Sequence, residues 1–373
     1  MSAITVRPLQ SPRDVRRFIK FQWVPYKGNP VWVPPLLLDR RKLIDRKKNP
    51  FYKHAAAEFF LAERDGRVVG RIGAIVNDNH NKEHHENIGF FGFFECIEDQ
   101  EVAFALFDAA RGWLKAKGVT AMRGPASPSV NDEYGMLVEG FEHPPAILMS
   151  YNPPYYPAFT EAYGFTKIKD LYTWYLDGSK VFSEKMVRVS EAAKQRQGLV
   201  LRSLNMKDFD NEVKMVHELY SRGWQSNWGE VPLTDDEFNY MAADLKAIVN
   251  PELVIIAEVK GKAIGFGLSL PDYNAVLKDN THGWLIPGIL RILLLKKRIK
   301  YARVVMLGVL PEFLNSGIGG ILFYETGRRI IASGMPNGEA SWVLEDNVMM
   351  NRGAQMMNGR ITKKHRLYEK SLQ

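Results

Sequence analysis

The stretch LGVLPEFLNSGIGGIL, residues 307–322, combines an apolar strand pattern, a proline and closely spaced glycines that lead into a helix pattern. The first N–H groups of a helix have no partner within the helix, and the helix dipole makes this end positive. Glycines let such a backbone approach a ligand closely. Gly317, Gly319 and Gly320 therefore predict a cradle for a phosphate group, although the same glycines would also suit a plain tight turn.

The composition is that of a globular protein with room for two domains. The chain has 373 residues, 46% of them hydrophobic, and a formal net charge of +8. A basic chain admits phosphorylated cofactors, nucleic acid and anionic lipid as partners without choosing among them. A single cysteine, Cys96, excludes an internal disulfide framework. Neither a signal peptide nor a membrane span is visible, so we expect a soluble cytoplasmic protein.

An internal repeat organises the chain. VRPL (6–9) matches LRSL (201–204), and AERDGRVVG (62–70) matches AEVKGKAIG (257–265), both at an offset of 195 residues. In each half, apolar runs flank a two-residue turn, Asp65-Gly66 or Lys260-Gly261, which is the signal of a β-hairpin. The order of elements is also shared, so the sequence predicts two copies of one α/β fold, each with a mixed and mostly antiparallel sheet flanked by helices.

The predicted boundaries follow from this repeat. We expect a first domain over residues 1–178, a connecting helix or linker over 179–198, and a second domain over 199–373. The first half continues with a strand, NIGFFGFFE, and an amphipathic helix that ends near Gly118. The second half continues with the strand ARVVMLGVL, the glycine turn and a helix that ends near Gly334.

The glycine turn resembles the pyrophosphate loop of the GNAT superfamily of acyl-CoA-dependent N-acyltransferases. The loop of that family follows the pattern V-x-P-x-x-Arg/Gln-x-x-G-x-G/A, and Val309, Pro311, Gly317 and Gly319 occupy its fixed points. The stretch SWVLEDNVMMNRGAQMMNGRI supplies Asn347 for the asparagine that follows the next strand. The resemblance implies a tandem GNAT protein over nearly the whole chain. It also implies that acetyl-CoA or a longer acyl-CoA binds to Leu307, Gly308, Val309, Leu314, Asn315, Ser316, Gly317, Ile318, Gly319, Gly320 and Asn347.

The departures from this pattern concern the loop and the acid. Leu314 replaces the Arg or Gln of the loop, so binding would rely on backbone N–H groups and the helix dipole. Ala354 stands where the usual tyrosine acid would be. The corresponding turn of the first half is rich in carboxylates, which would repel a pyrophosphate, so only the second domain is expected to bind the donor.

Aminolysis of a thioester needs a proton acceptor for the amine and a proton donor for the thiolate. Glu345, after the fifth strand of the second half, is the candidate base, and Tyr324, one turn into the helix, is the candidate acid. Glu345 and Asp346 could equally be a helix-capping pair, and Tyr324 could simply be part of the core.

Two polar or aromatic stretches are candidates for the acceptor site. The loop GPASPSVNDEYG could select an amine, although an exposed turn is the plainer interpretation. A second stretch, SRGWQSNWGEVPLT, carries two tryptophans that could bind a ligand or fill a seam between domains. The candidate acceptor residues are Asn131, Asp132, Glu133, Tyr134, Trp224 and Trp228.

The segment HGWLIPGILRILLLKKRIKYAR, residues 282–303, joins an apolar run to a basic cluster. It could lie on an anionic membrane over residues 284–300, or it could be an amphipathic helix whose apolar side is buried and whose basic end is solvated. The second interpretation is favoured.

Other chemistries have weaker support. HNKEHHE, residues 80–86, could bind a metal if helical, but it lacks the arrangement of H-E-x-x-H and is expected to be an exposed turn without metal. Nucleic-acid binding would rest on net charge alone and is not expected.

The sequence thus predicts an acyltransferase, of N-acetyltransferase type, that acts on an amine of a small molecule or peptide. The alternatives are an inactive GNAT-like scaffold that senses a ligand, and a long-chain N-acyl amino acid synthase acting at a membrane surface.

Overall fold

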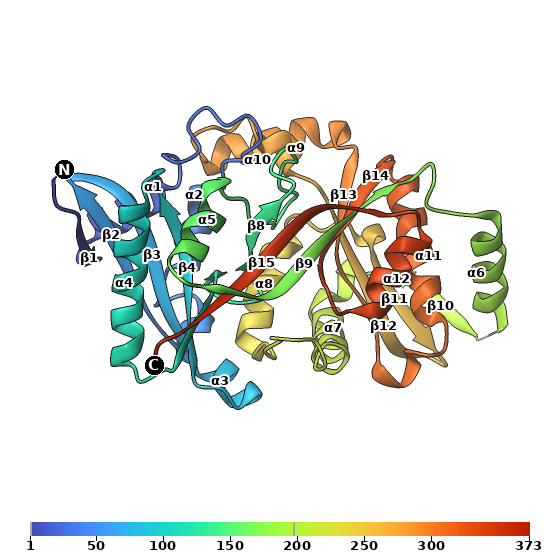
Figure 1. Cartoon of the computed structure of the whole chain (residues 1–373). Coiled ribbons are helices and arrows are strands. Elements are labelled where there is room, and N and C mark those ends of the chain that lie inside the picture. The colour runs from blue at the N-terminus through green and yellow to red at the C-terminus, as the bar shows by residue number, and fades with distance from the viewer. Residues whose placement is uncertain (1, 197) are drawn as a thin grey trace. The chain divides into compact units, whose positions relative to one another are not determined.

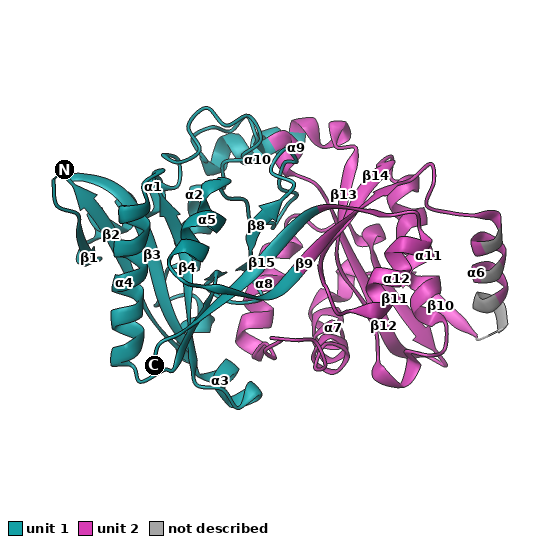
Figure 2. Ribbon diagram, viewed as in Figure 1, with its two compact units in different colours: residues 1–170, 277–293, 363–373 teal, residues 171–276, 294–362 magenta. Residues whose placement is uncertain are grey.

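The computed structural model describes residues 2–196 and 198–373. The chain divides into two compact units (Figures 1 and 2). Unit 1 comprises residues 1–170, 277–293 and 363–373, and unit 2 comprises residues 171–276 and 294–362. Relative to the contiguous boundaries at 178 and 199, unit 1 thus also includes two segments from the second half of the chain.

Unit 1 is built on a mixed sheet in the order β1-β2-β3-β4-β5-β15, with β8 also paired to β15. All pairs are antiparallel except β4 and β5, which are parallel over Ile88–Phe90 and Ala121–Arg123. The last strand comes from the C-terminal end of the chain. The strands are β1 (Thr5–Pro8), β2 (Ala55–Arg64), β3 (Arg67–Asn77), β4 (Ile88–Cys96), β5 (Ala121–Gly124), β6 (Ala126–Ser127), β7 (Glu133–Tyr134), β8 (Met136–Glu139) and β15 (Arg360–Ser371).

Helices cover both faces of the sheet in unit 1. Successive side chains of a strand point to opposite faces. Phe59 contacts Phe18 of α1, whereas Phe60 belongs to the core formed with α4. The two helices therefore lie on opposite faces. The helices are α1 (Pro12–Phe21), α2 (Leu37–Leu43), η1 (Pro50–Lys53), α3 (Asp78–His84), α4 (Gln100–Ala116), α5 (Tyr155–Ala162) and α10 (Leu285–Leu295), whose last two residues fall in unit 2.

Unit 2 repeats this plan in the order β10-β11-β12-β13-β14-β9. Its parallel pair is β13 and β14, and its last strand, β9, comes from the first half of the chain. The strands are β9 (Thr166–Asp177, from Leu171 in this unit), β10 (Leu199–Ser203), β11 (Val254–Val259), β12 (Lys262–Pro271), β13 (Tyr301–Val309) and β14 (Asn337–Leu344). The helices are α6 (Glu184–Arg196), η2 (Met206–Asp208), α7 (Phe209–Gly223), α8 (Asp235–Lys246), η3 (Pro251–Leu253), α9 (Asn274–Leu277), η4 (Lys296–Arg298), η5 (Pro311–Phe313), α11 (Ile318–Ala332) and α12 (Val348–Met356).

The predicted repeat of 195 residues is confirmed at the level of strand register. Val6 pairs with Ala62 in unit 1, and Leu201 pairs with Ala257 in unit 2. Both hairpins have a bulge after that alanine. Their turns have positive φ at Asp65-Gly66 and Lys260-Gly261, as a type I′ turn requires. The predicted connecting helix corresponds to α6, while residue 197 lies outside the described residues.

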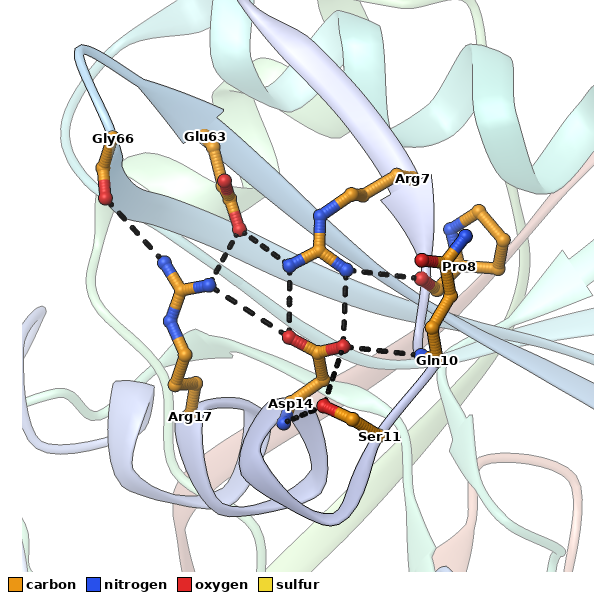
Figure 3. Close-up of polar contacts among 8 residues, drawn as sticks. All are labelled: Arg7, Pro8, Gln10, Ser11, Asp14, Arg17, Glu63 and Gly66. Carbon is orange, nitrogen blue, oxygen red and sulfur yellow. Dashed lines mark hydrogen bonds and ion pairs between the residues drawn. The ribbon is translucent and has the colours of Figure 1, made fainter.

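An ion-pair cluster at the start of each unit repeats as well. In unit 1, Arg7 contacts Glu63 at 2.9 Å and Asp14 at 2.8 Å, and Arg17 contacts Glu63 at 2.8 Å (Figure 3). Asp14 also accepts a hydrogen bond from the backbone N–H of Gln10 at 3.1 Å.

In unit 2, Arg202 contacts Glu258 and Glu212 in the same way, and Glu212 accepts from Asn205 N. Each cluster ties the first strand, its hairpin partner and the first helix together.

Two predicted local structures are wrong. Residues 78–84 form the short helix α3 rather than an exposed turn, because Asn77 caps it and His80 is buried against Phe90. The polar loop 124–135 is largely buried, because β6 lies against β4 inside unit 1.

We expect Asp14→Asn to lower the free energy of unfolding by about 1–3 kcal/mol at pH 7, since a buried acceptor of several hydrogen bonds loses its charge. Hydrogen bonds from Arg7 hold the pKa of Asp14 well below its ordinary value. A depressed pKa contributes stability above the ordinary pKa and loses it on acidification. The difference in the free energy of unfolding between wild type and Asp14→Asn should therefore become smaller below about pH 4. Urea unfolding at several pH values measures this, with Glu98→Gln, at an exposed carboxylate, as the neutral control.

Candidate active site

The central feature of unit 2 is a parallel strand pair that opens. β13 and β14 pair from Tyr301 with Asn337 to Val304 with Ala340, and the pairing ends there. β13 continues to Val309 while remaining paired with β12 on its other side. Its last residues therefore present an edge that β14 does not cover.

The register shows which N–H groups point toward this edge. Leu310 donates its N–H to Ile264 O of the β12 side at 2.8 Å. In an antiparallel pair, N–H groups two residues apart point the same way and neighbours point oppositely. Gly308 thus faces β12, while Leu307 and Val309 direct their N–H groups to the open edge. Among the described residues, no acceptor takes up these two groups.

The same edge in unit 1 is filled by the chain itself. Ile97 donates to Val69 O at 3.0 Å, which makes Cys96 the counterpart of Val309. The N–H of Cys96 donates to the hydroxyl of Tyr156 at 2.9 Å. Further along, the N–H of Phe93 donates to Ser127 Oγ at 2.8 Å. A Cβ at Gly92 would lie 1.7 Å from Ala126 O, so β6 fills the space beside the strand.

A buried carboxylate occupies unit 1 where unit 2 has a glycine. Glu95 pairs with Arg71 in the sheet, as Gly308 pairs with Phe266. Glu95 accepts hydrogen bonds from Tyr156 at 2.7 Å and Tyr26 at 3.0 Å. Burial raises the pKa of Glu95 to about 7, against the opposing effect of Arg71.

In unit 2, an aromatic stack lies over Gly308. A Cβ at Gly308 would lie 2.6 Å from the ring of Trp224, so glycine is needed for this close approach. The Trp224 ring packs on Phe266 and stacks on Tyr220 at 5.2 Å between centroids. The predicted acceptor residue Trp224, at the C-terminal end of α7, thus packs against β13, the strand that carries the open edge.

The stack leads to a carboxylate that the sequence did not single out. The hydroxyl of Tyr220 donates to Glu230 Oε1 at 2.6 Å, and Glu230 is 7% exposed. Burial raises the pKa of Glu230 to about 7, while the hydrogen bond from Tyr220 acts in the opposite direction. A carboxyl with this pKa can exchange a proton near neutral pH.

The glycine loop follows β13 directly. η5 leads to Gly317, which has φ +80° and is the N-cap of α11. Ser316 Oγ accepts the N–H of Ile318 at 3.2 Å, and Gly317 O accepts that of Ile321 at 3.3 Å. Within the described chain, no acceptor is present for the N–H groups of Gly319 and Gly320.

The space in front of these groups is open. A Cβ added at Gly317, Gly319 or Gly320 meets no atom within 4 Å. Just before the loop, Glu312 of η5 pairs with Arg222 at 2.8 Å, and Leu314 is 47% exposed. A helix N-terminus that is open in this way can bind an anion through its backbone N–H groups and the helix dipole.

The residues after β14 lie at the start of α12. Asn347 is the N-cap, and its side-chain oxygen accepts the N–H of Met350 at 3.1 Å. The helix is therefore capped by Asn347 and not by Glu345 or Asp346. Glu345 is half-buried, and its carbonyl accepts from Asn351 Nδ2 at 3.3 Å.

Two other predicted groups have structural neighbours of their own. Tyr324 of α11 is buried with its ring edge against Phe182 at 5.0 Å, and burial raises its pKa. Glu133 of unit 1 pairs with Arg40 at 2.6 Å, and Asp132 accepts from Ser129 Oγ at 2.6 Å.

The predicted site residues are thus distributed over both units. Unit 1 contains Asn131, Asp132, Glu133 and Tyr134. Unit 2 contains Trp224, Trp228, the glycine loop, Tyr324, Glu345 and Asn347.

Solved structures with the same architecture match the whole chain. The tandem GNAT protein from the clavulanic acid biosynthesis pathway has a TM-score of 0.58 and 14% identity, and the match covers 100% of this chain and 99% of that one. A GCN5-related N-acetyltransferase from Sphaerobacter thermophilus has a TM-score of 0.54 and 12% identity, covering 99% and 96%. The fold is that of a tandem GNAT protein.

Two curated proteins match over nearly their full length. The bacterial ceramide synthase of Caulobacter vibrioides is 35% identical over 377 residues, covering 99% of this chain and 98% of that protein. Protein YghO of Escherichia coli is 33% identical over 375 residues, covering 98% and 95%. No family model matches the chain. The chain belongs to the family of these two proteins and is an N-acyltransferase of the GNAT fold.

We expect Gly319→Glu to weaken binding of free CoA at least about tenfold, because a carboxylate would face the pyrophosphate in the cradle. The backbone φ at Gly319 is ordinary and the added side chain meets open space, so the fold should be unaffected. Gly319→Ala is the matched control and should bind CoA nearly as wild type does. Calorimetric titration measures both, and equal affinity of the two variants would exclude the cradle.

Proposed function

We propose that this protein transfers a long-chain acyl group from acyl-CoA to the amine of a lipid-like amino alcohol, forming an amide of the ceramide type. The observation that carries this proposal is the 35% identity to the Caulobacter vibrioides ceramide synthase along almost the entire length of both chains. It replaces acetyl transfer to a small molecule or peptide as the preferred reaction.

The donor is assigned to unit 2. Its strand edge at Leu307 and Val309 and its glycine loop are open, whereas in unit 1 Tyr156 takes the corresponding N–H group and Glu95 lies beside it. The start of α4 is also closed to an anion, because Asp99 accepts the N–H groups of Glu101 and Val102. The residues that would hold the donor are Leu307, Val309, Gly319 and Gly320.

When bound, acyl-CoA supplies a thioester carbonyl that an amine can attack. The N–H groups of Leu307 and Val309 are placed to donate hydrogen bonds to the negative charge that develops on that carbonyl oxygen. Fixed backbone donors need little reorganisation during the reaction. The bare Cα of Gly308 between them lets Trp224 cover the reaction site and limit the access of water.

The proton of the attacking amine is assigned to Glu230. Its carboxyl has a pKa of about 7 and is linked through Tyr220 and Trp224 to the strand edge. It would accept the proton through the Tyr220 hydroxyl, which already donates to it. Glu345 remains the competing candidate for this role, and Tyr324 the candidate proton donor to the thiolate.

The reaction is tested with a series of acyl-CoA donors from acetyl to long-chain and a long-chain amino alcohol as acceptor. Thiol release and mass spectrometry of the amide give kcat/KM for each donor, which we expect to rise with chain length. A preference for acetyl-CoA with small amines would favour an N-acetyltransferase that acts on a small molecule or peptide. CoA binding without turnover of any donor would favour a ligand-sensing scaffold.

We expect kcat/KM of the wild type to rise as pH increases through about 7, because the base acts in its deprotonated form and burial sets its pKa there. Glu230→Gln should lower kcat/KM by about 10²-fold or more and remove this rise. Glu345→Gln is the matched comparison. A pH rise that persists in Glu230→Gln and disappears in Glu345→Gln would transfer the role to Glu345.

A further inference from the structure

The helix α10 carries an apolar face that unit 1 does not bury. Seven of the sixteen exposed large hydrophobic side chains of the described chain lie within residues 284–294. Ile286 is 70% exposed and Leu293 is 59% exposed. The expectation that this segment buries its apolar side is therefore wrong. The exposed set is Trp284, Leu285, Ile286, Ile289, Leu290, Leu293 and Leu294.

The orientation of the helix is fixed by its other side. Gly288 is buried, and a Cβ there would lie 2.8 Å from Leu36 and 3.4 Å from Leu277. At the N-terminal end, Leu37 donates its N–H to Gly283 O at 2.8 Å, and Trp23 donates to Thr281 O at 2.7 Å. These contacts hold the glycine side of α10 against unit 1, to which the helix belongs up to Leu293 (Figure 2). The leucines and isoleucines at helical spacing consequently face outward.

The charges of this segment have one sign. Residues 280–303 contain no Asp or Glu and six Lys or Arg. Arg291 pairs with Asp279, so it is already neutralised. Lys296, Lys297 and Arg298 of η4 follow the apolar helix directly in the chain, and they and Lys300 are exposed.

We propose that α10 docks on an anionic membrane surface, with its apolar face in the boundary between headgroups and acyl chains. An exposed apolar helix face, a tryptophan at one end and a basic cluster at the other are the combination that binds such an interface. A neutral apolar partner protein would not call for the basic cluster. No helix in the described part of the chain is long and apolar enough to cross a membrane, so α10 would lie in the interface plane.

This surface gives the proposed reaction a source of substrate. Long-chain acyl-CoA and a lipid-like amino alcohol both partition into membranes, so an enzyme held at the surface meets them at high local concentration. The inference deepens the proposed function, but vesicle binding can be measured without catalysis. Failure of one therefore leaves the other testable.

The experiment is flotation of the full chain with vesicles of phosphatidylcholine alone and of phosphatidylcholine mixed with the anionic lipid phosphatidylglycerol. We expect binding to the anionic vesicles that weakens as salt increases. Leu290→Glu with Leu293→Glu should lower the partition coefficient at least about tenfold. Lys296→Glu with Lys297→Glu should lower it about tenfold for anionic vesicles.

Matched controls separate this surface from general stickiness and net charge. Val200→Glu and Met356→Glu change exposed hydrophobic residues outside α10. Arg13→Glu with Arg16→Glu, at exposed positions, changes the net charge by the same amount as Lys296→Glu with Lys297→Glu. These variants should bind vesicles nearly as wild type does.

Absence of binding to anionic vesicles, or equal loss in the controls, would overturn the proposal. A concentration-dependent dimer that the Leu290→Glu and Leu293→Glu pair abolishes, without any vesicle binding, would instead assign the face to a second copy of the chain.

Discussion

The candidate active site depends on one constraint, the end of pairing between two parallel strands. Parallel strands normally continue side by side, because an unpaired N–H or C=O in a protein interior costs free energy. In unit 2, β13 and β14 stop pairing after Val304 and Ala340 while β13 runs on. The open edge must then be satisfied by something other than the sheet. In the proposed function, the thioester carbonyl of the donor would meet this requirement, and the glycine loop at the end of the same strand would hold the donor's phosphates.

Unit 1 has the same topology, but its own side chains fill the corresponding edge. Its strand edge is satisfied by Tyr156 and Ser127, and the space beside it is filled by β6. Burying Glu95 there disfavours its charged form, and the hydrogen bonds from tyrosine hydroxyls offset part of that cost. The repeated ion-pair clusters and hairpins preserve the frame in both units. The ion pairs and hairpins therefore do not depend on the open strand edge, because unit 1 has them without such an edge.

The sequence was sufficient for features that depend on local pattern. The 195-residue offset predicted the paired hairpins, and residues 307–322 predicted the strand, the loop and the helix. Features that depend on burial were beyond it. In the sequence, Glu230 cannot be distinguished from a surface glutamate, because its burial depends on the contact with Tyr220. The loop 124–135 was expected to be exposed because it is rich in polar residues, and the sequence does not show that it packs inside unit 1. The apolar run at 284–294 was expected to be buried because soluble proteins usually bury such residues.

The two carboxyls with raised pKa occupy different positions relative to the open edge, and this difference bears on their roles. Glu95 is part of its strand, accepts hydrogen bonds from the hydroxyls of Tyr156 and Tyr26, and lies 3.7 Å from Arg71. Glu230 lies behind Tyr220, whose hydroxyl donates to it and whose ring stacks on Trp224. A base at a distance from the strand suits a neutral thioester, because a carboxylate buried directly against the thioester would lose its hydration. In the proposed mechanism, a base set back from the strand would accept the proton of the amine, while the backbone N–H groups would contact the carbonyl.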